Sequence, residues 1–101
     1  YVSDAGKAYA EIFQTLLEDF DGKYDGREAK HFSTLKFLNE TSMPAIILEP
    51  LFMDHDEDVR PLLTYKGRQK LAQAIADGIR EVLRKDFRDH VEATGAKVLT
   101  C

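Results

Sequence analysis

The sequence predicts an α/β fold with the element order helix, strand, strand, helix. Three observations support this prediction. Apolar residues recur at helical spacing in two stretches, residues 4–20 and 65–87. Between them lie a stretch rich in β-forming residues, 32–38, and a short apolar run, 45–48. Helices on either side of a pair of strands are typical of a sheet flanked by helices.

The first predicted helix spans residues 4–20. Its apolar side chains recur at helical spacing: Ala8, Ile12, Phe13, Leu16, Leu17 and Phe20. Ser3 or Asp4 can cap the N-terminus, because both carry a side-chain oxygen that accepts from a free backbone N–H. Gly22 lies just past the helix and opens a predicted polar loop over residues 22–26.

Two strands are predicted in the middle of the chain. Residues 32–38 alternate roughly in polarity, whereas residues 45–48 form a continuous apolar run, as in a strand that is covered on both faces. Pro50 lacks a backbone donor, which suits the end of a strand. Because two strands alone are marginally stable in water, we expect this chain to dock on a larger sheet.

The second long helix is predicted over residues 65–87, with Thr64 as its N-cap. Four of its apolar residues form a stripe at i, i+4 spacing that we interpret as core packing: Leu71, Ile75, Ile79 and Leu83. Residues 88–101 are interpreted as a tail or linker, in which 97–99 can form a short strand. The predicted domain therefore covers residues 1–87.

Composition and charge limit the class of protein. The 101 residues are 44% hydrophobic and 32% charged, as in an ordinary soluble globular domain. The net charge of −4 argues against nucleic acid or an anionic membrane as the main partner. No apolar run is long enough to span a membrane, and the single Cys101 excludes an internal disulfide. The start at Tyr1 suggests a fragment, a processed chain or one piece of a larger fold.

Glu49 ends the apolar run 45–48 and is the main candidate for a functional residue. An ionised carboxylate is costly to bury alone. A glutamate that closes a buried strand therefore sits at a strand-end site, is paired, or has a raised pKa. The carboxyl ends of strands are also where open α/β sheets bind their ligands.

The histidines do not have the spacing of a zinc site. His31, His55 and His90 are far apart in the sequence, with no i, i+4 pair and no cysteine partner. His55 follows Glu49 in a predicted loop, where it either lines a cleft or is solvated. The solvated interpretation is the simpler one, and no metal ligand is assigned in this chain.

Three aspartates, Asp54, Asp56 and Asp58, alternate as they do in a calcium-binding loop. The pattern then fails, because Val59 stands where the turn glycine belongs and Tyr65 stands where the bidentate glutamate belongs. We therefore predict a solvated acidic loop.

Three stretches carry a resemblance to a known family. They are Asp25-Gly-Arg-Glu-Ala-Lys30, Leu38-Asn-Glu-Thr-Ser-Met-Pro-Ala-Ile-Ile-Leu-Glu49 and Leu71-Ala-Gln-Ala-Ile-Ala-Asp-Gly-Ile79. With these stretches, residues 8–83 resemble the C-terminal half of the catalytic domain of the zinc-dependent N-acetylmuramoyl-L-alanine amidases of bacteria and phages. The middle and last stretches have the separation found in that family.

The resemblance implies a hydrolase with a twisted sheet between layers of helices. Such an enzyme, an endolysin or an autolysin, cleaves the amide between N-acetylmuramic acid and L-alanine in peptidoglycan. It acts on the cell wall from outside the cell, from the periplasm or as a phage product. The resemblance also implies that a zinc-activated water attacks the amide and that Glu49 is the general acid and base. The family's zinc ligands lie upstream of the helix that opens this chain, so zinc is expected only for the complete domain.

The resemblance further suggests how substrate is held. Arg27 and Lys30 are candidate contacts for the anionic stem peptide, although ordinary surface charges are an equal interpretation. Asn39 stands where the family frequently has arginine and is a third candidate. The expected partners are the stem peptide, the glycan and a missing N-terminal half.

Two alternative functions stay open. The chain can be a catalytically inactive module, derived from the amidase fold, that binds cell wall or a protein partner. It can also be an unrelated small α/β domain in which the motif occurs by chance.

Overall fold

The computed structural model describes residues 1–21 and 28–95, with the backbone alone for residues 19–21. It contains four α-helices, α1 (Asp4–Asp21), α2 (Lys36–Asn39), α3 (Asp56–Val59) and α4 (Tyr65–Thr94), and a 3₁₀ helix, η1 (Arg60–Leu63). None of the described residues forms a β-strand. The prediction of an α/β fold with part of a twisted sheet is therefore wrong, and the described chain is helical.

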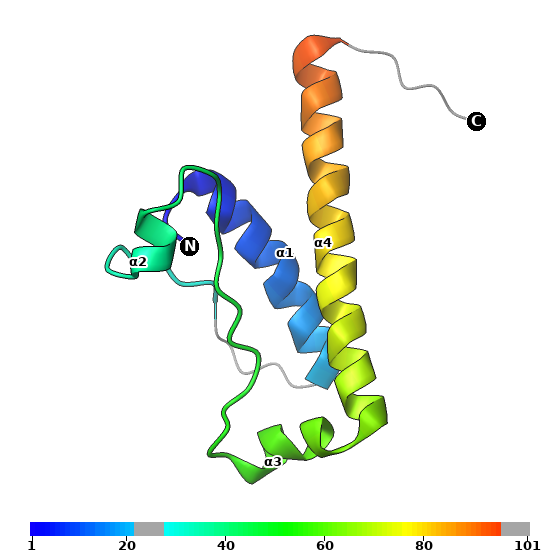
Figure 1. Ribbon diagram of the computed structural model, residues 1–101. Coiled ribbons are helices and arrows are strands. Elements are labelled where there is room, and N and C mark those ends of the chain that lie inside the picture. Colours follow the sequence, from blue (N-terminus) through cyan, green and yellow to red (C-terminus); the bar gives the residue numbers. More distant parts are fainter. Residues whose placement is uncertain (22–27, 96–101) are drawn as a thin grey trace, which may run out of the picture.

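Helices α1 and α4 pack against each other as an antiparallel pair (Figure 1). The ring of Phe13 in α1 lies against Gly78 in α4, where a Cβ added to the glycine would be only 2.3 Å from Cε1 of the ring. Nearer the start of α1, the Tyr9 hydroxyl donates a 2.5 Å hydrogen bond to Oδ1 of Asp86. Phe13 and Ala74 are buried in this contact region. The absence of a side chain at Gly78 is what lets the two backbones approach.

Both long helices begin where the sequence predicts. Oγ of Ser3 accepts a 3.0 Å hydrogen bond from the Gly6 N–H at the start of α1. Oγ1 of Thr64 accepts a 3.0 Å hydrogen bond from the Gly67 N–H at the start of α4. These contacts satisfy N–H groups that have no partner inside the helix. The two helices and their caps are confirmed.

Helix α4 extends beyond its predicted end at residue 87. It continues to Thr94 and stops at Gly95, whose φ of 66° is left-handed and favours glycine. Residues 88–94 of the predicted tail are thus helical. The predicted loop at 22–26, Arg27 and the predicted strand at 97–99 lie outside the described residues.

The face of α4 that contacts α1 differs from the predicted stripe. Leu71 and Ile75 are half-buried, but Ile79 and Leu83 are 52% and 64% exposed. Successive i, i+4 residues rotate by about 40° around a helix, so four of them wrap around it by about 120°. The contact face follows mixed three- and four-residue steps instead, through Leu71, Ala74, Ile75, Gly78 and Val82.

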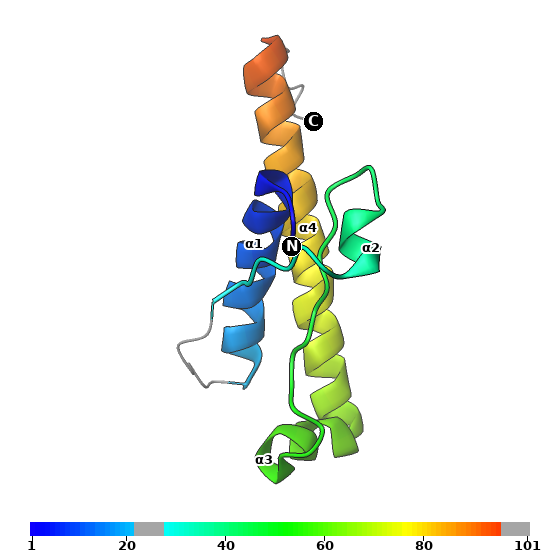
Figure 2. The ribbon, with the colours of Figure 1, turned by 90° about the vertical axis from the view of Figure 1, so that its left-hand side faces the viewer.

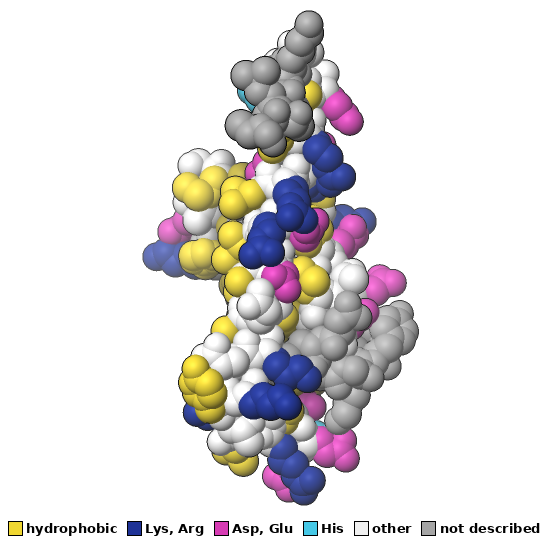
Figure 3. Space-filling view, turned by 90° about the vertical axis from the view of Figure 1, so that its right-hand side faces the viewer, with side chains coloured by type: hydrophobic (Ala, Val, Ile, Leu, Met, Phe, Trp, Pro, Cys, Tyr) yellow, Lys and Arg dark blue, Asp and Glu magenta, His cyan; other side chains and the backbone are white. Residues whose placement is uncertain are grey.

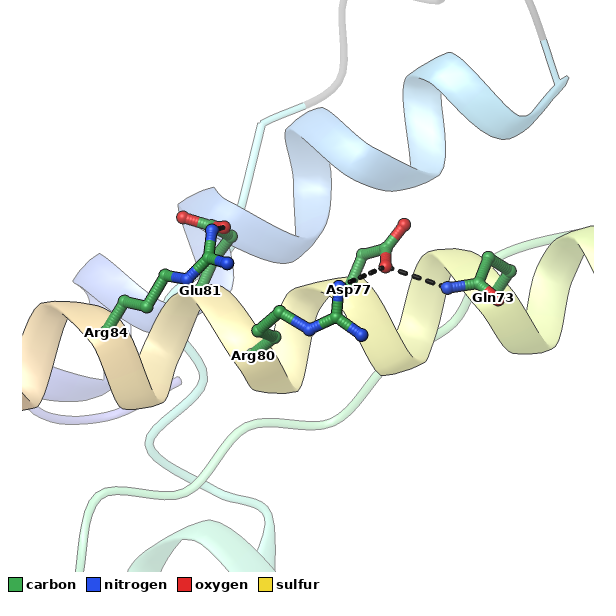
Figure 4. Close-up of polar contacts among 5 residues, drawn as sticks. All are labelled: Gln73, Asp77, Arg80, Glu81 and Arg84. Carbon is green, nitrogen blue, oxygen red and sulfur yellow. Dashed lines mark hydrogen bonds and ion pairs between the residues drawn. The ribbon is translucent and has the colours of Figure 1, made fainter. Parts of the chain in front are cut away.

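The outer face of α4 mixes apolar and charged side chains (Figure 3). Its polar contacts link successive helical turns, as Figure 4 shows: Gln73 donates to Asp77 at 2.8 Å, Arg80 lies 3.9 Å from Asp77, and Arg84 lies 2.8 Å from Glu81. Exposed pairs of this kind contribute only about 0.3–0.5 kcal/mol each. Packing against α1 is therefore the larger source of stability for α4.

The predicted strand at 32–38 is replaced by a bend and one helical turn, α2. The Leu35 carbonyl accepts from the N–H groups of Leu38 and Asn39, at 3.1 and 3.0 Å. This turn buries Leu38, which is 5% exposed, while Phe37 is 60% exposed. Burial of one leucine through a local turn thus overrides the β-propensity of the segment.

The predicted strand at 45–48 is a length of irregular chain that leads from α2 to α3 (Figures 1 and 2). Its beginning lies against α1, where the Ala45 carbonyl oxygen is 3.2 Å from the position that a Cβ on Gly6 would occupy. No backbone hydrogen bond pairs it with another segment of the described chain. A strand is defined by a ladder to a neighbour, and the described residues provide no such neighbour.

Few of the described side chains are buried. Among them, the buried apolar residues are Phe13, Leu38 and Ala74, whereas twelve large apolar side chains are exposed, including Phe52, Leu63 and Phe87. The radius of gyration is 16.0 Å, against about 13 Å for a compact domain of this size. No helix in the described ranges is long and apolar enough to cross a membrane.

The Phe13–Gly78 contact leads to a first prediction. Gly78→Ala adds a methyl group at 2.3 Å from the Phe13 ring, so the helices must separate. Overpacking of this kind costs about 1–3 kcal/mol, which exceeds the gain of about 1 kcal/mol in helix propensity. We expect a lower free energy of unfolding, measured by urea denaturation and circular dichroism. In a Phe13→Leu background the same substitution should cost clearly less, and an equal loss in both backgrounds would contradict the explanation.

The Tyr9–Asp86 hydrogen bond leads to a second prediction, on pH. This bond raises the pKa of Tyr9 above its ordinary value of 10.0, and partial desolvation and the charges of Asp86 and Asp89 raise it further. The stabilising contribution of the Tyr9–Asp86 hydrogen bond is therefore fully present below the pKa of Tyr9 in the unfolded chain. It is lost as pH rises through the pKa of Tyr9 in the folded chain.

We expect Tyr9→Phe to lower the free energy of unfolding by up to about 1 kcal/mol near neutral pH, and by less well above the ordinary tyrosine pKa. Urea denaturation of the wild type and of Tyr9→Phe, near neutral pH and again well above the ordinary tyrosine pKa, measures the difference in free energy of unfolding. The control is Tyr65→Phe, at a side chain that is 71% exposed. If the difference in free energy of unfolding between the wild type and Tyr9→Phe is unchanged in alkali, the Tyr9 hydroxyl does not stabilise the fold through its hydrogen bond to Asp86.

Candidate functional site

An open cavity of about 780 Å³ lies beside α1, on the side where the chain passes from α2 to α3. Five parts of the chain line it: Tyr1, the middle and second half of α1, residues 28–38, residues 47–52, and the start of α3 with its N-cap His55. Much of its wall is apolar, contributed by Leu17, Phe32, Leu35, Leu38, Ile47, Leu48, Leu51 and Phe52. A concave and largely apolar surface with a few polar groups is the usual form of a ligand site.

Glu49 lies on the wall of this cavity, between the half-buried Leu48 and Pro50. Its side chain is exposed, and its carboxylate has no hydrogen-bond or ion-pair partner among the described residues. The charge therefore needs no compensating group, because it stays in contact with water. A carboxylate in this position is accessible to a ligand in the cavity.

The loop that follows Glu49 is held by Asp58. Oδ2 of Asp58 accepts a 2.9 Å hydrogen bond from the Phe52 N–H, and Oδ1 lies 3.8 Å from Nδ1 of His55. The backbone adds a turn, because the His55 N–H donates to the Phe52 carbonyl at 3.3 Å. Asp58 thus closes the loop that begins at Phe52 at the edge of the cavity, and its side chain is only 19% exposed.

Carboxylates outnumber cations around the cavity. The acidic residues that line it are Glu18, Glu28, Glu49, Glu57 and Asp58. Lys30 and His55 are the cationic or potentially cationic residues among the described side chains of the lining. An anionic ligand is therefore expected to depend on these two side chains for favourable charge contacts.

The structure brings together some of the sequence-predicted site residues. Lys30 lines the same cavity as Glu49, and its side chain is exposed. Asn39, the last residue of α2, is not part of the cavity lining. Its side-chain amide donates to the Ser33 carbonyl. Arg27 lies outside the described residues.

No group of three or more metal-ligating side chains comes together in the described ranges. His31 packs edge-on against Tyr1, with ring centroids 5.6 Å apart, whereas His55 lies at the cavity and His90 is exposed on α4. The three acidic residues of the predicted loop do not form a calcium loop, because helix α3 begins at Asp56. The described part of the chain does not fit a zinc site.

The contribution of Asp58 is not predicted by the sequence analysis. A local signal does exist, because an acidic residue three positions after a helix N-cap commonly returns to a backbone N–H before the helix. His55 is the N-cap of α3 and Asp58 stands at the third helical position. Here the carboxylate reaches past the cap to Phe52.

Comparison with known proteins gives a matching family and a curated relative. The family described as N-acetylmuramoyl-L-alanine amidase matches residues 2–81. A curated protein of Clostridium perfringens (strain 13 / Type A), described as uncharacterized, is 34% identical over 89 residues, which are 85% of this chain and 25% of that protein. The chain thus spans about a quarter of the length of this relative. The comparison with solved structures found no match.

Proposed function

Because this chain belongs to the N-acetylmuramoyl-L-alanine amidase family, we propose that it is part of a peptidoglycan hydrolase that cleaves the amide between N-acetylmuramic acid and L-alanine. One observation carries the role of this chain: the exposed carboxylate of Glu49 lies on the wall of an open, largely apolar cavity. A carboxylate within reach of bound substrate can exchange protons with it. The site of action is the cell wall, reached from outside the cell, from the periplasm or by a phage product.

Glu49 is proposed as the general acid and base. As a base it removes a proton from the attacking water, so that the oxygen bonds to the carbonyl carbon of the amide. As an acid it returns that proton to the nitrogen of L-alanine when the carbon–nitrogen bond breaks. The products are a carboxyl group on the muramic acid side and a free amine on the stem peptide, and Glu49 regains its starting state.

The zinc ion that the family resemblance implies is not assigned to this chain. The described residues bring no ligand set together, and the role of Glu49 is derived without a step through the metal. In the complete domain the ligands are proposed to come from outside this chain. The chain's length relative to its curated relative is compatible with that arrangement.

The lining of the cavity also supports a proposal for substrate binding. Lys30 shares the cavity with Glu49, so its ammonium group is proposed to contact an anionic group of the stem peptide. Arg27 remains a proposed contact for the same peptide. Asn39 lies on α2 outside the cavity lining, where it can meet only parts of the substrate that extend beyond the cavity, such as the glycan.

The role of Glu49 leads to a third prediction. In the full-length protein, Glu49→Gln removes the proton-exchanging group but keeps the size of the side chain. We expect release of stem peptide from purified cell walls to fall by about 10²–10⁴-fold, the usual contribution of general acid–base catalysis. Chromatography of the soluble products measures the rate, and the metal content should equal that of the wild type.

The matched control is Glu92→Gln, at an exposed glutamate of α4 that does not line the cavity. It should leave the rate unchanged. Near-normal cleavage by Glu49→Gln would refute the proposed role. Cell-wall binding without cleavage by the wild-type full-length protein would instead favour the inactive binding module.

A further inference from the structure

His55 lies on the same cavity as Glu49, six positions further along the chain. The loop between them is closed by the hydrogen bond from the Phe52 N–H to Asp58, and by the turn between Phe52 and His55. The backbone at His55 is thereby held relative to the segment that carries Glu49. A ligand that contacts Glu49 therefore occupies a cavity that the side chain of His55 also lines.

The ring of His55 has one side occupied and one side available. Nδ1 faces Oδ1 of Asp58 at 3.8 Å, and the side chain is 60% exposed. Asp58 is itself held by its second oxygen, which accepts from the Phe52 N–H. At 3.8 Å the approach of Nδ1 to Oδ1 is a charge contact rather than a hydrogen bond. When the ring is protonated, the contact draws its Nδ1 edge toward Asp58 and leaves Nε2 as the nitrogen that can meet a ligand.

The charges around the cavity indicate which ligand group His55 suits. The charged groups that share the cavity with it are Glu49, Glu57 and Asp58 of its own segment, Glu18 of α1, and Glu28 and Lys30 of the segment after α1. A stem peptide ends in a carboxylate, which five acidic side chains repel. An imidazolium can form a charge-assisted hydrogen bond with such a carboxylate and offset part of this repulsion.

We infer that His55 contacts a carboxylate of the stem peptide in this cavity, and that Asp58 positions its ring. The inference rests on the proposed amidase function and adds a specificity-determining residue to it. His55 acts on binding and takes no part in the proton transfers assigned to Glu49. Substitution should therefore change KM and leave kcat unaltered.

The test uses the full-length protein and a soluble N-acetylmuramoyl peptide, together with the same peptide whose C-terminal carboxylate is amidated. His55→Gln is expected to raise KM for the free-acid peptide by about three- to tenfold, as for the loss of one exposed charge-assisted contact. kcat should be unchanged, and the effect should be smaller for the amidated peptide. Asp58→Asn should raise KM less, because its amide oxygen can still accept from the Phe52 N–H. His90→Gln, at an exposed histidine of α4, should behave as the wild type.

A binding measurement keeps the test independent of turnover. In a Glu49→Gln background, which is expected to bind without cleaving, calorimetry compares the affinity for the free-acid peptide with and without His55→Gln. Equal affinities, or an equal loss for the free-acid and amidated peptides, would overturn the inference. If Glu49→Gln loses activity but His55→Gln keeps the wild-type KM, the inference about His55 is wrong and the proposed function stands. If Glu49→Gln keeps full activity, the proposed function itself is wrong.

Discussion

The close packing of the Phe13 ring on Gly78 is the contact on which the arrangement of this chain depends. It sets the distance between α1 and α4, the two elements with the most extensive contact in the described chain. In the first turn of α4, Gly67 lies so close to Pro61 that a Cβ on the glycine would be 1.7 Å from the Pro61 carbonyl oxygen. Helix α4 therefore positions η1 and α3 as well. These two glycines thus set how closely α1 and η1 approach α4.

The cavity is a consequence of this arrangement. One wall belongs to α1, and the opposite wall belongs to the chain between α2 and α3. The second wall has no backbone ladder to a neighbouring segment within the described residues. Its position depends on side-chain contacts and on the loop closed by Asp58. A site built in this way combines a rigid helical wall with an irregular one, and functional residues often lie on irregular segments that a rigid scaffold supports.

The sequence suggested Glu49 as a candidate site residue through its immediate neighbours, because an acidic residue at the end of an apolar run is a local pattern. It could not show which other side chains meet it. Lys30 and His55 share the cavity with Glu49, whereas Asn39 does not line it. Those relations depend on where α1 and α3 lie, which no local pattern specifies. The bond from Phe52 to Asp58 is different, because an acidic residue at the third position of a helix is a local signal for it, although its partner Phe52 lies before the N-cap.

The sequence alone predicted α1, the start of α4 and the Thr64 cap, and it offered Ser3 or Asp4 as the cap of α1, of which Ser3 accepts the hydrogen bond. It did not predict that α4 continues past residue 87 to Thr94. Helical hydrogen bonds and caps join residues a few positions apart, so the information lies within each segment. The tertiary structure decided the rest. Residues 32–38 and 45–48 have strand-like composition, but a strand needs a partner that the described chain does not supply. Only the packing of α1 selected which face of α4 is covered, and it left Ile79 and Leu83 exposed.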